Sequence, residues 1–96
     1  GHVDGISILE EITKNENAWI LKFSLNCNLI KYLAKKCSIA VDGISLTVNE
    51  VFNDSFNVSI IPFTWENTNL QSSTVGTPFN IEIDMLSRYV FRALNK

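Results

Sequence analysis

The most informative chemistry in this 96-residue sequence lies in the segment ISLTVN, residues 44–49. Polar side chains occupy every second position, those of Ser45, Thr47 and Asn49, with apolar side chains between them. Because successive side chains of a strand point to opposite faces, the three polar groups are expected on one face. Hydroxyl groups both donate and accept hydrogen bonds, which suits them to a planar heterocyclic ligand. The same pattern fits an ordinary strand with one solvent-facing side, and periodicity alone favours that plainer interpretation.

Four polar residues elsewhere could carry chemistry, and each also has an ordinary structural explanation. His2 is the single histidine and could transfer a proton, although a lone histidine near a terminus is usually exposed and idle. Asp84 stands directly before a helical pattern, where its carboxylate would cap the helix. Lys36 fits a helix C-terminus, and Thr64 fits a turn. One histidine and two cysteines without ligand spacing predict no metal site.

Length and composition describe one domain, residues 1–96, and a hydrophobic content of 46% supports a real core. The net charge of -2 and the lack of a basic run argue against nucleic-acid binding. No apolar stretch is long enough to span a bilayer. We expect Cys27 and Cys37 to be reduced thiols of a cytoplasmic protein, with a disulfide between them as the weaker alternative. The sequence starts at Gly1, so we expect one lobe of a longer protein.

Period-two alternation and turn residues predict six strands. They are expected at residues 5–15, 19–25, 38–42, 44–52, 56–63 and 79–84. In the fifth, Pro62 cannot donate to a ladder, so the strand should end or bulge there. The pair Asp42-Gly43 is typical of a tight hairpin turn. Helices are expected only as short pieces, at residues 28–36 with Asn28 as N-cap, 66–70 and 85–96.

Six short strands with few and short helices predict an all-β fold, either a barrel or a sandwich. Closure into a small barrel would remove the exposed strand edges that invite aggregation. The last segment places its apolar residues on one stripe of an amphipathic terminal helix, namely Leu86, Tyr89, Val90 and Ala93.

Four segments, in this order and at this spacing, resemble the riboflavin synthase family. They are GHVDG at residues 1–5, KYLAKKCSIAVDGISLTVNEV at 31–51, IIPFTWENTNL at 60–70 and FNIEID…RYV at 79–90. The resemblance covers nearly the whole chain, and SIAVDGISLTV is its most specific part. Ser45 stands where the N-terminal lobe of that two-lobed family has a cysteine, and the MFTG that opens the N-terminal lobe is absent. The chain is therefore similar to the C-terminal lobe.

The resemblance implies a six-stranded antiparallel Greek-key barrel with short helices and a C-terminal helix. It implies riboflavin biosynthesis by a transferase that dismutates two molecules of 6,7-dimethyl-8-ribityllumazine. A four-carbon unit passes between them and gives riboflavin and 5-amino-6-(ribitylamino)uracil, with no cofactor or metal. The implied partners are lumazine and riboflavin, the N-terminal lobe of a neighbouring subunit and, in the complete enzyme, a homotrimer. An isolated lobe would supply one substrate site and catalyse poorly.

The same resemblance implies roles for individual residues of this chain. His2 would transfer protons in the catalytic cycle. Ser45, oriented by Asp84, would bind or activate the ring or act as a transient nucleophile. The implied substrate-binding positions are Lys36 at the rim, Asp42, Ser45, Thr47, Ile61, Pro62 and Thr64.

Three positions depart from the family pattern. Cys37 stands where glycine is usual, which is unfavourable if the backbone there has a positive φ. Phe63 replaces a histidine or glutamate, and Trp65 replaces a leucine, both close to the expected pocket.

Three alternatives stay open at this point. Lumazine proteins of luminous bacteria share the architecture and bind the chromophore without catalysis, so the chain could be a carrier. The lobe could also be an inert half, or self-associate through its terminal helix or its open pocket face. A flavin-binding barrel of the reductase type is the third alternative, although the basic phosphate-binding motifs usual in such proteins are not found.

Overall fold

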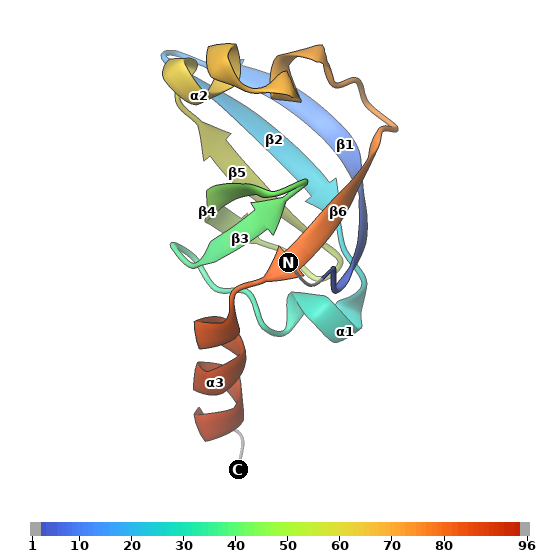
Figure 1. Ribbon diagram of the computed structural model, residues 1–96, viewed down its shortest axis with the longest axis vertical. Helices are drawn as coiled ribbons and strands as arrows, with labels where there is room; N and C mark the ends of the chain where they lie inside the picture. The colour runs from blue at the N-terminus through green and yellow to red at the C-terminus, as the bar shows by residue number, and fades with distance from the viewer. Residues whose placement is uncertain (1–2, 95–96) are drawn as a thin grey trace.

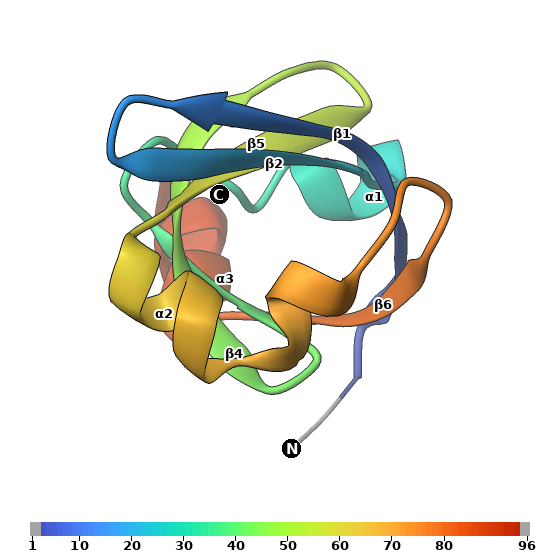
Figure 2. The same cartoon turned by 90° about the horizontal axis from the view of Figure 1, so that it is seen from above.

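The computed structural model describes residues 3–94, in which six strands close into a barrel (Figure 1). The strands are β1 (Gly5–Asn15), β2 (Ala18–Ser24), β3 (Ser38–Val41), β4 (Ile44–Val51), β5 (Ser55–Ile60) and β6 (Pro78–Ile83). The helices are α1 (Cys27–Ile30), α2 (Pro62–Asn67), the 3-10 helix η1 (Asn69–Ser72) and α3 (Met85–Leu94). Helices α2 and η1 lie across one end of the barrel, and α3 projects from the other (Figure 1, Figure 2).

The strand order around the barrel is β1-β2-β5-β4-β3-β6, and β6 pairs back to β1. Neighbouring strands run antiparallel in every pair. Strands β3, β4 and β5 follow one another, and β6 returns beside β3, which is a Greek key. The predicted all-β fold is therefore confirmed as a closed six-stranded antiparallel barrel, and the sandwich alternative is wrong.

Alternation along the strands sends one set of side chains into a common core. Phe23 is fully buried, and its ring centroid lies 5.4 Å from that of Phe56 and 5.3 Å from that of Phe79. Burial of one side chain of this size contributes about 1.5 to 3 kcal/mol to stability. Three strands thus meet at one aromatic cluster, which holds the barrel closed from inside.

The segment that opened the sequence analysis behaves as its alternation predicts. In β4, Ser45, Thr47 and Asn49 are exposed, and Leu46 and Val48 between them are buried. The turn before β4 has positive φ at both central residues, 47° at Asp42 and 81° at Gly43. A tight hairpin turn with two positive φ values favours an Asp-Gly pair, so the turn fixes the register of β4.

Helix α1 is shorter and starts earlier than the helical spacing predicts. It spans four residues, and its N-cap is Asn26 rather than Asn28. The reason is local: Asn26 Oδ1 accepts the backbone N–H of Asn28 at 2.8 Å. Because α1 ends at Ile30, Lys36 lies outside any helix. The prediction that Lys36 balances a helix dipole is therefore wrong.

Strand β5 ends before Pro62, as predicted, but the segment after it is more helical than predicted. Strand β5 ends at Ile60, and Pro62 is the first residue of α2. A proline fits the first turn of a helix because that position has no backbone partner for an N–H. Thr64 lies inside α2 rather than in a turn or on the strand. The single helical turn predicted at residues 66–70 is replaced by α2 and η1.

Helix α3 confirms the predicted terminal helix over residues 85–94, and its apolar stripe is largely exposed. Leu86 is 65% exposed, Tyr89 61% and Val90 50%. The ring of Phe91 meets that of Tyr32 edge-on at 5.0 Å between centroids. An exposed apolar stripe of this kind is typical of an interaction surface.

Two further expectations concern a disulfide between the cysteines and a membrane-spanning helix. Cys27 is exposed and Cys37 half-buried, and both are free thiols, so the disulfide alternative is wrong. None of the helices within residues 3–94 is long and apolar enough to cross a membrane.

Candidate functional site

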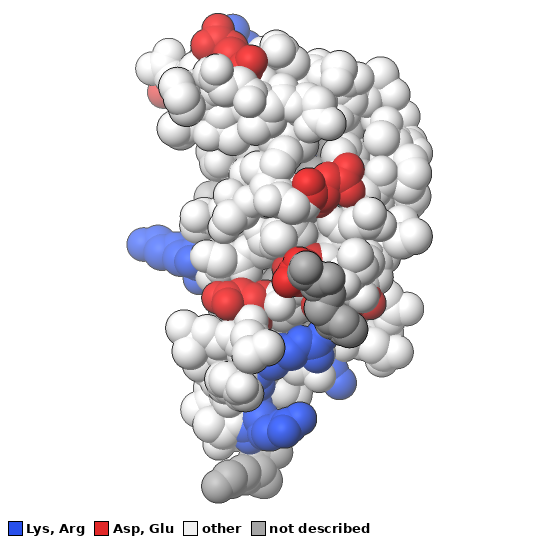
Figure 3. Space-filling model, in the orientation of Figure 1, with Lys and Arg blue, Asp and Glu red and all other residues white. Residues whose placement is uncertain are grey.

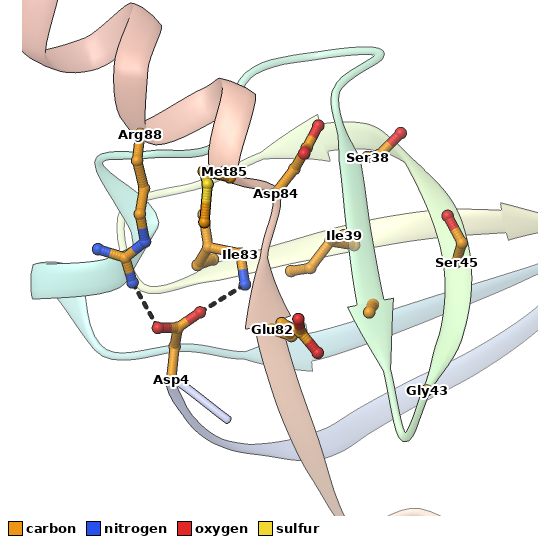
Figure 4. A pocket seen from close by; sticks show the side chains of 11 residues that line it. Asp4, Ser38, Ile39, Gly43, Ser45, Glu82, Ile83, Asp84, Met85 and Arg88 are labelled. Carbon is orange, nitrogen blue, oxygen red and sulfur yellow. Dashed lines mark hydrogen bonds and ion pairs between the residues drawn. The ribbon is translucent and has the colours of Figure 1, made fainter. Parts of the chain in front are cut away.

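An open groove on the outer face of β3, which we call the β3 groove, is the candidate site (Figure 4). It has a volume of about 600 Å³. Its lining includes Asp4, Ser38, Ala40, Ser45, Glu82 and Asp84, with Arg88 among the residues around them. Ala40 pairs with Ser45 of β4 on one side and with Glu82 of β6 on the other. Because Ala40 and Ser45 are small, this row of the sheet leaves room for a flat molecule above it.

The structure places two of the predicted catalytic residues, Ser45 and Asp84, in this one groove. Ser45 projects from β4 and is exposed, whereas Asp84 directly follows β6 and is half-buried. Asp84 Oδ1 accepts the backbone N–H of Leu86 at 3.3 Å, as expected of a residue that caps α3. The sheet therefore aligns a hydroxyl and a carboxylate along one surface. Their catalytic roles stay predictions.

Carboxylates dominate the charge of the β3 groove. It contains Asp4, Glu82 and Asp84, against the single guanidinium of Arg88. Arg88 is already engaged, since its Nη2 lies 2.6 Å from Asp4 Oδ1. Acidic side chains mark the middle of the molecule, and basic ones lie below them over α3 (Figure 3). A groove rich in acceptors suits a neutral ligand that carries N–H and O–H donors.

Lys36 and Thr47 line a neighbouring pocket of about 490 Å³ together with Ser59. Thr47 pairs with Ser38, which lines the β3 groove, so the two depressions adjoin. Lys36 itself has a φ of 71°, in the left-handed region. Cys37 is not among the positive-φ residues, so replacement of the usual glycine there costs no backbone strain. The strain falls on Lys36 instead.

Asp42 has a structural partner in the fold. Its carboxylate Oδ1 accepts the backbone N–H of Asn80 at 2.7 Å, and its own N–H donates to the Asn80 carbonyl at 2.8 Å. These bonds tie the hairpin turn between β3 and β4 to β6. The substrate-binding role predicted for Asp42 stays a prediction.

The predicted binding residues after β5 lie away from the β3 groove. Ile61, Pro62 and Thr64 are not among its lining residues. Pro62 instead lines a separate pocket with Trp65, whose ring stacks on that of Trp19 at 4.4 Å between centroids. Trp65, which is expected close to the pocket of Ser45, is likewise not among the lining residues of the β3 groove.

Two residues complete the comparison with the sequence predictions. His2 lies outside the described residues. Phe63 is 71% exposed and lines neither the β3 groove nor the pocket around Lys36. Within residues 3–94, no group of three or more His, Cys, Asp and Glu side chains is arranged to hold a metal ion.

Sequence reasoning missed several residues that line the groove. Ser38 and Ala40 alternate with the buried Ile39 in SIAV, so the same period-two signal used for β4 could have found them. Asp4 and Arg88 gave no local signal, because their contact joins residues 84 positions apart.

The fold and the site define a closed antiparallel β-barrel that carries an open, acceptor-rich groove on its outer face. A family model described as "Lumazine binding domain" matches residues 1–84. The chain therefore belongs to the lumazine-binding-domain family, and the resemblance found in the sequence is confirmed.

Relatives and solved structures agree with this assignment. The chain is 41% identical to riboflavin synthase of Actinobacillus pleuropneumoniae and 38% identical to that of Bacillus subtilis, over 100% of this chain and 45% of each relative. It thus spans about half the length of the curated relatives it matches. LumP solved with 6,7-dimethyl-8-(1'-D-ribityl) lumazine has the same fold, with a TM-score of 0.81 at 21% identity over 88% of this chain and 48% of that one. LumP solved with riboflavin gives a TM-score of 0.80.

We predict that Lys36→Gly is about 1 kcal/mol more stable than Lys36→Ala, because only glycine adopts the left-handed region without a steric cost. Both variants lose the ammonium group, so their difference isolates the backbone. Urea unfolding followed by tryptophan fluorescence measures it. The matched control is Lys35, an exposed neighbour that is not among the positive-φ residues. At Lys35 the alanine variant should be more stable than the glycine variant. The same order of stability at both positions would contradict the prediction.

Proposed function

We propose that this chain is a substrate-binding lobe of a riboflavin synthase, corresponding to the C-terminal lobe, and that the β3 groove holds one molecule of 6,7-dimethyl-8-ribityllumazine. The reaction passes a four-carbon unit from one lumazine to another and yields riboflavin and 5-amino-6-(ribitylamino)uracil. One observation carries the proposal: Ser45 and Asp84 share an open groove on a chain that is 41% identical over its whole length to a riboflavin synthase.

The chemistry of the groove fits a flat ring that carries a polyol. The Ser45 hydroxyl can donate to a ring carbonyl or accept from a ring N–H. The carboxylates of Glu82 and Asp84 can accept hydrogen bonds from ribityl hydroxyls, and hydrogen bonds to charged groups are the stronger ones. In the dismutation, the 7-methyl carbon of the donor loses a proton. We assign proton transfer to His2, and ring binding or activation to Ser45 with Asp84.

An open groove covers one face of a flat ligand and leaves the other face accessible. Two lumazines must meet in a fixed orientation, and holding two reactants together supplies much of the rate of such a reaction. In this proposal, the second lumazine comes on the N-terminal lobe of a neighbouring subunit in a homotrimer. The chain covers 45% of its relatives, which leaves room in them for a second lobe of similar size. The lobe alone should bind substrate but turn it over slowly.

Ser45→Leu is expected to weaken binding of riboflavin and of 6,7-dimethyl-8-ribityllumazine about tenfold or more, because it removes a hydrogen-bonding group and fills the floor of the groove. Titration of ligand fluorescence with the 96-residue chain measures this. The control is Thr13→Leu, at an exposed position of β1 outside the groove. Equal affinities of the two variants and the wild type would contradict the proposal that the β3 groove is the binding site.

Turnover is expected to require both lobes. Addition of the separately purified N-terminal half of the Bacillus subtilis relative should raise riboflavin formation by the chain about tenfold or more, since only the mixture can hold two substrates together. Riboflavin is followed by its absorbance after chromatography. Each half alone is the control. Tight binding without turnover in the mixture would favour the non-catalytic carrier over the enzyme.

Assembly is expected to depend on the apolar stripe of α3. Val90→Glu should lower the mass of any complex measured by analytical ultracentrifugation towards that of one chain, because it places a charge in a surface that association would bury. Arg92→Glu is the matched control, since Arg92 lies on the same helix outside the stripe. An unchanged mass for Val90→Glu, with an associated wild type, would contradict a role of the stripe in assembly.

A further inference from the structure

The nearly buried carboxylate of Asp4 joins three separate parts of the fold beside the β3 groove. Its side chain is only 5% exposed. Asp4 Oδ1 accepts from Arg88 Nη2 at 2.6 Å, and Asp4 Oδ2 accepts the backbone N–H of Ile83 at 2.7 Å (Figure 4). The Asp4 backbone N–H donates to the carbonyl of Ile81 at 2.8 Å. One residue before β1 thus holds both the end of β6 and the first turns of α3.

Ile83 and Arg88, the two residues bound by the Asp4 carboxylate, lie on either side of Asp84 in the sequence. Ile83 directly precedes Asp84, and Arg88 follows it by four residues, with its backbone N–H donating to the Asp84 carbonyl at 3.3 Å. The Asp84 backbone is therefore held from the strand side by one oxygen of Asp4, and from the helix side by the other. Movement of Ile83 or Arg88 would shift Asp84 relative to Ser45 on the far side of the groove.

Arg88 is fixed by a second contact and still reaches the groove. Its guanidinium carbon lies 4.7 Å from the ring centroid of Tyr32, an arrangement that favours a cation over an aromatic face. Its side chain is 36% exposed, and both Arg88 and Asp4 are lining residues of the β3 groove. A purely structural ion pair could lie anywhere on the barrel. This one lies where the ligand of the proposed function would bind.

We propose that Asp4 and Arg88 are positioning residues of the β3 groove, which hold Asp84 at the place from which it acts on a bound lumazine. The inference rests on the proposed function. A binding group must be held within about half an ångström of its productive place, and residues that lock such groups matter nearly as much as the groups themselves. Loss of the pair should therefore alter how the ligand is held, in addition to any change in stability.

The test uses the 96-residue chain with 6,7-dimethyl-8-ribityllumazine and riboflavin as probes. Asp4→Asn keeps the shape of the side chain but removes its charge, Arg88→Met removes the cation, and Arg88→Lys keeps it. The control is Leu70→Ala, a buried residue of η1 at the other end of the barrel that lowers stability without touching the groove. Two quantities are measured for each variant: the affinity for each probe, and the absorption spectrum of lumazine bound to saturating protein. The temperature is one at which circular dichroism shows each variant folded.

Asp4→Asn and Arg88→Met are expected to weaken binding about tenfold and to change the spectrum of the bound lumazine. Arg88→Lys should recover most of the affinity, and Leu70→Ala should bind within about twofold of the wild type. Unchanged affinity and spectrum in Asp4→Asn, or an equal loss in Leu70→Ala, overturns the inference while the proposed function stands. If the wild type binds neither probe, the proposed function fails, and this inference fails with it.

Discussion

The pairing of β6 with both β1 and β3 is the constraint on which the rest of the structure depends. It closes the barrel, and closure fixes which side of each strand faces the core. Ile39 and Ile83 pair with one another and are both buried. Ala40 must then face outward, between Ser45 and Glu82. A slip of one residue would turn the Ile39 side chain outward and the Ala40 side chain into the core, so the packing of the core determines which side chains form the outer surface of the groove.

The same closure explains how the two ends of the sequence come to share one site. Asp4 precedes β1 and Arg88 follows β6, and the two strands lie side by side. A carboxylate that is 5% exposed is tolerated only if its oxygens are paired, and here a guanidinium and a backbone N–H pair them. Removal of Arg88 would leave this carboxylate with one charged partner fewer, at a cost below that of a fully buried pair because the Arg88 side chain is 36% exposed. Part of the stability of the barrel is thus located at the edge of the β3 groove.

How far the sequence predicts this molecule depends on the range of the interaction involved. The strands and the exposed face of β4 follow from period-two alternation, and the end of β5 follows from Pro62, because these signals lie within a few residues. Ser45 and Asp84 could be singled out by resemblance, but only the barrel brings them together. The N-cap of α1 was misplaced because Asn26 and Asn28 carry the same capping group. Asp4 had no predictable partner, since its contact spans 84 positions.

The β3 groove and the apolar stripe of α3 are two exposed surfaces that lie close to one another, because Asp84, Met85 and Arg88 at the start of α3 line the groove. On the stripe, Leu86 and Tyr89 are each more than half exposed. Asp84 belongs to the groove and also caps α3, so the two surfaces meet at one residue. In the proposed assembly, association through α3 would bring a neighbouring lobe to the open side of the groove. The exposed stripe of α3 and the open groove would then have one explanation, because the contact between the proposed subunits would also present the proposed second substrate.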